Sequence, residues 1–345
     1  MIKPPILRPG DRIAAISLSH GWPAVYPRAY QNGKRQLREA FGVEVVESRH
    51  ALADPDWLAT HPEARAADLM EVLKNPSIQG IVSTIGGDDS IRILPHLDYS
   101  VIRANPKIFL GYSDSTVTHF AFLKAGVVSF YGPSLMAGFD ENGGLLSYMA
   151  ESVRQILFAP SPSVLISPNT DGWTIESWEW DKEERHAMKR KLRPGSGWNW
   201  LQGSGKHRGT LMGGCLEVMD WLRGTPVWPS PADWRNSILF LETSEDQPSP
   251  AAVTHMIRSL AATGALNQEV RGILFGRPYG DEASFQAYDD ALLRVLAELG
   301  LTSIPVITRM DFGHTDPKFT LPIGIAAEID CDARQIRLIE SSTTS

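Results

Sequence analysis

Cysteine is almost absent from this sequence, which excludes two classes of protein. Cys215 and Cys331 are the only cysteines among 345 residues, and they stand far apart, without the close spacing of metal ligands. Disulfide-stapled secreted domains need several cysteines, and structural zinc sites need clustered cysteine and histidine ligands. We therefore expect no disulfide framework, no metal and no cofactor, and the composition fits a reducing cytoplasm.

Long apolar runs are missing as well. No segment approaches the roughly 20 apolar residues that a membrane-spanning helix requires. The first residues, Met1 to Pro5, lack the apolar core of a secretion signal. The sequence therefore predicts a cytoplasmic protein that does not enter a membrane.

Basic residues are fewer than acidic ones. The sequence has 33 lysines and arginines and 40 aspartates and glutamates, which gives a net charge of -7. This balance argues against nucleic acid as the main partner, because nucleic-acid surfaces are usually basic. The hydrophobic share of 43% and the charged share of 21% are those of an ordinary globular protein. A chain of 345 residues exceeds what one core usually organises, so we expect two domains.

Short apolar runs alternate with amphipathic stretches in the first half of the chain. The predicted strands are 12–18, 80–85 and 107–110, and the predicted helices are 30–41, 63–74, 90–94 and 116–124. Such alternation indicates a mainly parallel sheet with helices on both faces. Ligands of these folds gather beyond the carboxyl ends of the strands.

A change of composition from Ser161 to Gly209 separates the two halves. This segment is rich in proline, glycine, tryptophan and charge, with little periodicity, and we interpret it as a linker with a long loop. Beyond it, the predicted helices are 214–222, 251–263 and 284–299, and the predicted strands are 237–241, 270–275, 304–308, 323–329 and 335–339. We expect an N-terminal α/β domain over 1–160, the tryptophan-rich loop over 161–209, and a C-terminal α/β domain over 210–345.

Ser113 follows an apolar strand and a glycine turn and opens a predicted helix. This pattern is typical of a nucleophile elbow, in which a tight turn exposes the serine Oγ. Alternatively, Ser113 or Asp114 only caps the helix, and Ser115 stands where the second glycine of the elbow motif is expected.

A second glycine turn, Gly86-Gly87, lies between a predicted strand and a predicted helix. Free backbone N–H groups in such a turn can bind an anion. Gly87 could supply one N–H donor to an oxyanion and Asp114 the other. A plain turn with an acidic cap is the alternative interpretation.

Glu242 and His314 also stand just past predicted strands. A glutamate in this position can orient a histidine, as the third member of a catalytic triad does. We assign Glu245 to the turn that follows. Because the serine, the glutamate and the histidine all lie beyond the carboxyl ends of strands, Ser113, Glu242 and His314 are predicted to form one catalytic site.

Six short stretches form an ordered set along the chain. They are Ser83 to Ser90, Asn105 to Asp114, Tyr131 to Pro133, Gly213 to Glu217, Leu241-Glu242 and Gly313-His314. This set, within about residues 9–339, resembles the LD-carboxypeptidase family of serine peptidases, and is most similar to its microcin C immunity branch. The resemblance implies an N-terminal domain like that of class I glutamine amidotransferases, a smaller C-terminal α/β domain and a homodimer.

The resemblance also implies a Ser-His-Glu triad at the junction of the domains. Its members fall on Ser113, His314 and Glu242. Gly86, Tyr112 and Cys215 are expected to contact substrate, although asparagine is common in the family where Cys215 stands.

Five tryptophans crowd into the irregular segment among basic residues. They are Trp173, Trp178, Trp180, Trp198 and Trp200, interleaved with Lys182, Arg185, Lys189, Arg190, Lys191 and Arg193. Aromatic faces beside cations form a platform for a planar anion such as a nucleotide, whereas packing of the loop is the alternative. We expect Trp178 and Trp180 to contact ligand, since the immunity branch associates a tryptophan of this loop with base stacking.

These patterns predict a serine amidase for a small peptide or aminoacyl-nucleotide. We favour aminoacyl or peptidyl nucleotides, as in toxin detoxification, over a murein LD-tetrapeptide of cell-wall recycling. A kinase that cradles ATP on the glycine turn would leave Ser113 and His314 without a role. A non-catalytic binding protein and a cysteine hydrolase based on Cys215 are further alternatives, the latter without a histidine placed near the thiol.

Overall fold

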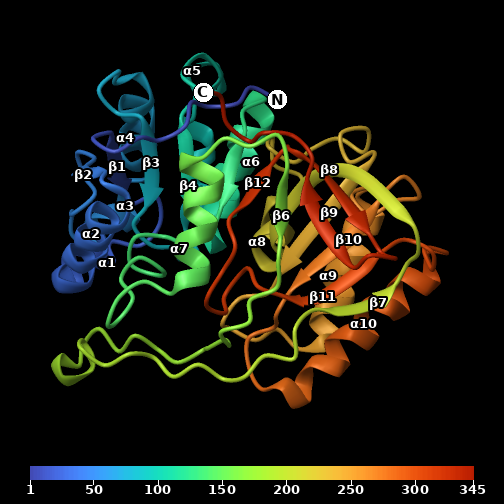
Figure 1. The fold of residues 1–345 in the computed structure, drawn as a ribbon. Coiled ribbons are helices and arrows are strands. Elements are labelled where there is room, and N and C mark those ends of the chain that lie inside the picture. The colour runs from blue at the N-terminus through green and yellow to red at the C-terminus, as the bar shows by residue number, and fades with distance from the viewer.

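Six strands form the first sheet of the computed structural model, which describes all residues 1–345 (Figure 1). In spatial order they are β12 (Leu321–Ile323), β5 (Ser129–Tyr131), β4 (Ile108–Gly111), β3 (Gly80–Ser83), β1 (Arg12–Ile16) and β2 (Glu44–Glu47). All neighbours pair in parallel except β12, which is antiparallel to β5. The helices of this half of the chain are α1 (Trp22–Val25), α2 (Pro27–Phe41), α3 (Pro55–Thr60), α4 (Pro62–Lys74), α5 (Tyr99–Ala104), α6 (Thr116–Ala125) and α7 (Ser147–Val153). Three short helices of other types are η1 (Ser90–His96), η2 (Ser113–Ser115) and η3 (Arg154–Phe158).

Eight strands form the second sheet. In spatial order they are β6 (Val164–Ile166), β14 (Gln335–Leu338), β13 (Ala326–Asp330), β8 (Lys206–Cys215), β9 (Ser237–Glu242), β10 (Gly272–Gly276), β11 (Val306–Met310) and β7 (Asn199–Gln202). The central strands β8 to β11 are parallel, and antiparallel strands flank them. The helices of this half are α8 (Leu216–Leu222), α9 (Pro250–Ala262) and α10 (Phe285–Glu298), with short turns η4 (Glu183–Arg185) and η5 (Glu282–Ser284).

The predicted α/β class with two parts is confirmed, but the segment 161–209 is more ordered than we expected. It supplies β6, β7 and the start of β8 to the second sheet. β6 and β7 are short and largely half-buried or exposed, so they carry no alternating apolar pattern. β12, from the C-terminal half, joins the first sheet, and the division of the chain at residues 160 and 210 stays a prediction.

The helix predicted from Gly214 begins at Leu216 instead, because Gly213 and Gly214 belong to β8. A Cβ at Gly213 would lie 1.7 Å from the carbonyl oxygen of Phe240. Glycine is therefore required where β8 and β9 run close together.

Buried apolar side chains form two clusters, and each cluster contains residues from both sheets. Phe109 of β4 and Leu239 of β9 belong to one buried cluster, and their neighbours Leu110 and Phe240 belong to the other. Successive residues of a strand point to opposite faces, so each cluster covers one face of both sheets. This continuous packing fixes the end of β4 relative to the end of β9. No helix in the structure is both long and apolar enough to cross a bilayer.

Candidate active site

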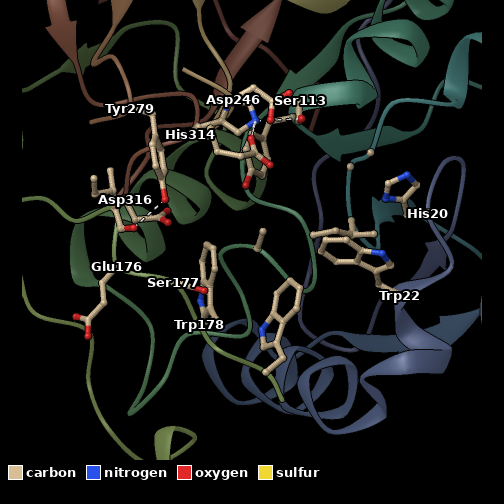
Figure 2. A pocket seen from close by; sticks show the side chains of 18 of the residues that line it. His20, Trp22, Ser113, Glu176, Ser177, Trp178, Asp246, Tyr279, His314 and Asp316 are labelled. Atoms are coloured by element: carbon tan, nitrogen blue, oxygen red, sulfur yellow. Dashed lines mark hydrogen bonds and ion pairs between the residues drawn. The ribbon is translucent and has the colours of Figure 1, made fainter. Parts of the chain in front are cut away.

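The carboxyl ends of parallel strands from both sheets meet at one cavity of about 380 Å³ (Figure 2). β3 leads to Gly86 and β4 leads to Ser113. β9 ends at Glu242, and β11 leads to the loop that carries His314. The topology thus brings together the four residues that the sequence placed beyond separate strands.

His314 bridges Ser113 and Glu242. Its Nε2 lies 3.0 Å from the Oγ of Ser113, and its Nδ1 donates to the Oε2 of Glu242 at 2.6 Å. The glutamate is buried and Ser113 is half-buried. An imidazole whose Nδ1–H is held by a carboxylate can present Nε2 as a base, so this geometry can deprotonate the serine hydroxyl.

Ser113 is held in a left-handed backbone conformation, with φ at 61°. This conformation costs a non-glycine residue about 1–3 kcal/mol and persists only where neighbours enforce it. The buried carboxylate of Asp114 helps, since it accepts hydrogen bonds from the N–H and the hydroxyl of Ser90 at 2.9 and 2.7 Å. The strand, strained serine and helix together have the geometry of a nucleophile elbow.

Gly86 keeps the space beside Ser113 open. A Cβ on Gly86 would lie 3.1 Å from Ser113 Oγ and 3.6 Å from the backbone nitrogen of Asp114. Gly87 also lines the cavity, and its N–H donates to no acceptor within the protein. Gly87 thus borders the cavity, the backbone nitrogen of Asp114 lies close behind Gly86, and their role as oxyanion donors stays a prediction.

Tyr131 links the nucleophile to the glutamate. Its hydroxyl accepts from the backbone N–H of Ser113 at 3.1 Å and donates to the Oε1 of Glu242. We assigned no role to Tyr131 from the sequence, where it was only part of a motif. A buried tyrosine hydroxyl needs a partner, but the partners lie far along the chain, so the sequence does not show them.

Replacing Tyr131 by phenylalanine should lower kcat about 10- to 100-fold with little change in KM. The variant leaves the Ser113 N–H unpaired and removes a donor from Glu242, losses of about 1–3 kcal/mol. Steady-state kinetics check this prediction, with Tyr148→Phe as the control, because that hydroxyl bonds the Ser167 carbonyl away from the cavity. A kcat within twofold of wild type for Tyr131→Phe would remove the positioning role.

Glu245 makes a second carboxylate contact to His314. Its Oε2 lies 3.0 Å from Nε2, the same nitrogen that faces Ser113. Burial lowers the pKa of His314, but Glu242 and Glu245 outweigh it and raise this pKa to about 10. Glu245 lies in the turn to which we assigned it, and it also lines the cavity, a role that we did not predict.

Aromatic side chains line the part of the cavity away from Ser113. Trp178 and Trp180 are stacked, with ring centroids 5.9 Å apart and planes 24° apart. Trp180 packs edge-on against Trp22 of α1. In Figure 2, Trp178 and Trp22 lie across the cavity from Ser113. Trp178, Trp180, Gly86 and Tyr112, all expected to contact substrate, line this cavity.

The basic residues of the tryptophan loop do not form a free cationic platform, which was one of the two interpretations of this segment. Their ion pairs are Lys182–Glu179, Arg185–Glu176, Arg185–Glu179, Arg190–Glu141, Arg190–Asp316 and Arg193–Asp281. Arg190 is buried and lies 3.9 Å from the centre of the Trp178 ring. Trp178 and Trp180 line the cavity, but carboxylates compensate most of the cations.

Cys215 lies outside the cavity lining, so the expected substrate contact is not supported. The side chain is 1% exposed, and its thiol donates to Glu217 at 3.4 Å. Burial and the nearby carboxylates of Glu242 and Glu217 raise the pKa of this thiol, which disfavours the thiolate that a cysteine hydrolase needs.

Comparison with known proteins identifies both halves of the chain. Residues 13–132 match the LD-carboxypeptidase N-terminal domain, and residues 208–329 match the LD-carboxypeptidase C-terminal domain. The microcin C7 self-immunity protein MccF of Escherichia coli is 32% identical over 80% of this chain and 78% of its own length. A solved structure of MccF in complex with glutamyl sulfamoyl guanosine superposes with a TM-score of 0.87 over the full length of both chains, at 28% identity. A probable murein peptide carboxypeptidase of Bacillus subtilis is 26% identical over 99% of this chain and 95% of its own length.

Proposed function

The chain belongs to the LD-carboxypeptidase family, and on that basis we propose that it is a serine amidase for aminoacyl or peptidyl nucleotides. The observation that carries this proposal is the bridge from Ser113 through His314 to Glu242, beside a cavity that is also lined by a stacked tryptophan pair. Family membership gives no support to the kinase alternative.

The proposed reaction begins with Ser113. Its Oγ attacks the amide carbonyl carbon while His314 Nε2 takes the hydroxyl proton. The N–H groups of Gly87 and Asp114 stabilise the oxyanion. The carbon–nitrogen bond then breaks as His314 returns the proton to the leaving nitrogen, and a water molecule hydrolyses the acyl-serine by the same steps. Glu242 holds the imidazole in the required tautomer throughout.

The stacked pair of Trp178 and Trp180 favours a nucleotide over a short peptide. A base can stack on an indole for about 1–3 kcal/mol, whereas a murein peptide offers no planar ring of that size. The ligand in the related MccF structure, glutamyl sulfamoyl guanosine, joins an aminoacyl group to a nucleoside. Hydrolysis of such compounds would detoxify them, and we propose self-immunity or resistance as the role in the cell. A homodimer is part of the proposal, and sedimentation velocity would test it.

Replacing Trp178 or Trp180 by alanine should lower kcat/KM for an aminoacyl sulfamoyl adenosine about 5- to 100-fold, chiefly through KM. The expected size is that of one lost stacking contact. Hydrolysis of a murein LD-tetrapeptide should change less than twofold. Trp221→Ala is the control, because Trp221 is exposed and does not line the cavity.

Murein recycling is the second candidate, favoured by the similarity to the murein peptide carboxypeptidase of Bacillus subtilis over nearly the whole chain. Values of kcat/KM measured side by side for the two substrates separate the candidates. A preference for the tetrapeptide, with both tryptophan variants equal to wild type, would replace detoxification by cell-wall recycling.

A further inference from the structure

Glu245 lies where the acyl half of a substrate must bind. Both its carboxylate and the Ser113 hydroxyl lie 3.0 Å from His314 Nε2. Ser113 would attack the carbonyl carbon from about van der Waals distance. A group on the carbon next to that carbonyl therefore comes within reach of the Glu245 carboxylate.

Glu245 also forms no ion pair with a lysine or arginine. The side chain is 62% exposed, and its only ion-pair partner is His314. Two further carboxylates of the site are committed to other partners, because Asp316 pairs with Arg190 and Lys318, and Glu242 binds Nδ1 and Tyr131. A cationic substrate group would thus find the Glu245 carboxylate available beside the scissile bond, and Asp246, which also lines the cavity, makes no contact with the histidine.

The contact between Glu245 and His314 conflicts with catalysis. If Nε2 carries a proton and donates it to the Glu245 carboxylate, it cannot accept the proton of Ser113. A competing cation would draw the carboxylate away and free the nitrogen. Such a cation must sit close to the carbonyl that Ser113 attacks.

Resting on the proposed function, we propose that Glu245 binds the free α-ammonium group of an aminoacyl substrate and is thereby drawn away from His314. The α-ammonium group stands on the carbon next to the scissile carbonyl in an aminoacyl nucleotide. In a peptidyl nucleotide, the nitrogen on this carbon belongs to the preceding peptide bond, so it is a neutral amide and carries no charge. Glu245 accordingly selects acyl groups with a free α-amine, and substrate binding itself prepares the histidine to act as a base.

The test uses alanyl sulfamoyl adenosine, whose α-nitrogen is a cationic ammonium, and its N-acetyl derivative, whose α-nitrogen is a neutral acetamide. Wild-type enzyme should prefer the free amine by at least about tenfold in kcat/KM, the size of one charge-assisted hydrogen bond. In Glu245→Gln, a nearly isosteric change at an exposed position, this ratio should fall about tenfold. Glu282→Gln, the same change at an exposed position that does not line the cavity, should keep the wild-type ratio.

A pH profile separates this role from a structural one. Glu245→Gln removes one of the two anions that stabilise the imidazolium, so the acid limb of kcat/KM for the N-acetyl compound should shift to lower pH. An unchanged limb, or a Glu245→Gln variant that keeps the preference for the free amine, overturns the inference while the proposed function stands. If the wild-type enzyme hydrolyses neither compound, the proposed function is wrong, and the inference about Glu245 is wrong as well.

Discussion

Replacing Ser113 by alanine is expected to lower kcat at least about a thousandfold while the protein stays folded. Removal of a triad nucleophile usually costs this much or more, because no other group can form the acyl intermediate. The Oγ makes one hydrogen bond, to His314, so its loss leaves the packing intact. Rates with an aminoacyl sulfamoyl adenosine and thermal melting of both proteins are the measurements.

His314→Ala should be as inactive as Ser113→Ala, and the double variant should be no slower than either single one. When two residues act together in one catalytic step, removing either one abolishes the rate enhancement that both provide. Independent, additive losses would show that the two side chains do not share that step. Turnover near wild type in purified Ser113→Ala would end the serine-hydrolase assignment.

Replacing Gly86 by alanine should lower kcat about 100-fold or more. The new methyl group would stand 3.0 Å from Ser113 Cβ and 3.1 Å from its Oγ, where it displaces the hydroxyl and fills the space for the oxyanion. Loss of oxyanion stabilisation alone costs about 10²–10³ in kcat. Stability should change little, because Gly86 is not at positive φ.

Gly195→Ala is the matched control for this change. Its added Cβ would meet only ordinary contacts, with the nearest atom at 3.6 Å on Trp173, and the residue does not line the cavity. Its kcat should stay within twofold of wild type. If Gly86→Ala instead raises KM and leaves kcat unchanged, the space beside Ser113 binds substrate and not the oxyanion.

Those parts of the site that depend on strand ends could be predicted from the sequence. Ser113, Glu242 and His314 each follow an apolar run, and parallel strands bring such positions to one edge of a sheet. Gly86 and Gly87 were found by the same signal. The helix 116–124 was also predicted correctly, with Gly126 in the left-handed conformation that ends it.

Parts of the site that depend on contacts between distant segments could not be predicted. The pairing of Arg190 with Glu141 and Asp316 joins residues that no local pattern connects, so the loop cations were taken as free. The roles of Tyr131 and Glu245 depend on contacts with Ser113, Glu242 and His314, which lie on distant segments of the chain and meet only in the folded structure. β6 and β7 escaped prediction because edge strands of three and four residues carry too little apolar pattern.

Labelling with a fluorophosphonate, followed by mass spectrometry, tests most directly whether Ser113 is the nucleophile of a hydrolase. This reagent transfers a phosphonyl group to an activated serine and releases fluoride, so an inert binding protein of the same fold would remain unlabelled. We expect one adduct per chain, on the peptide that contains Ser113, and none on Ser113→Ala. A preparation that hydrolyses its substrate while Ser113 stays unlabelled, or that carries the adduct on another residue, would contradict the account.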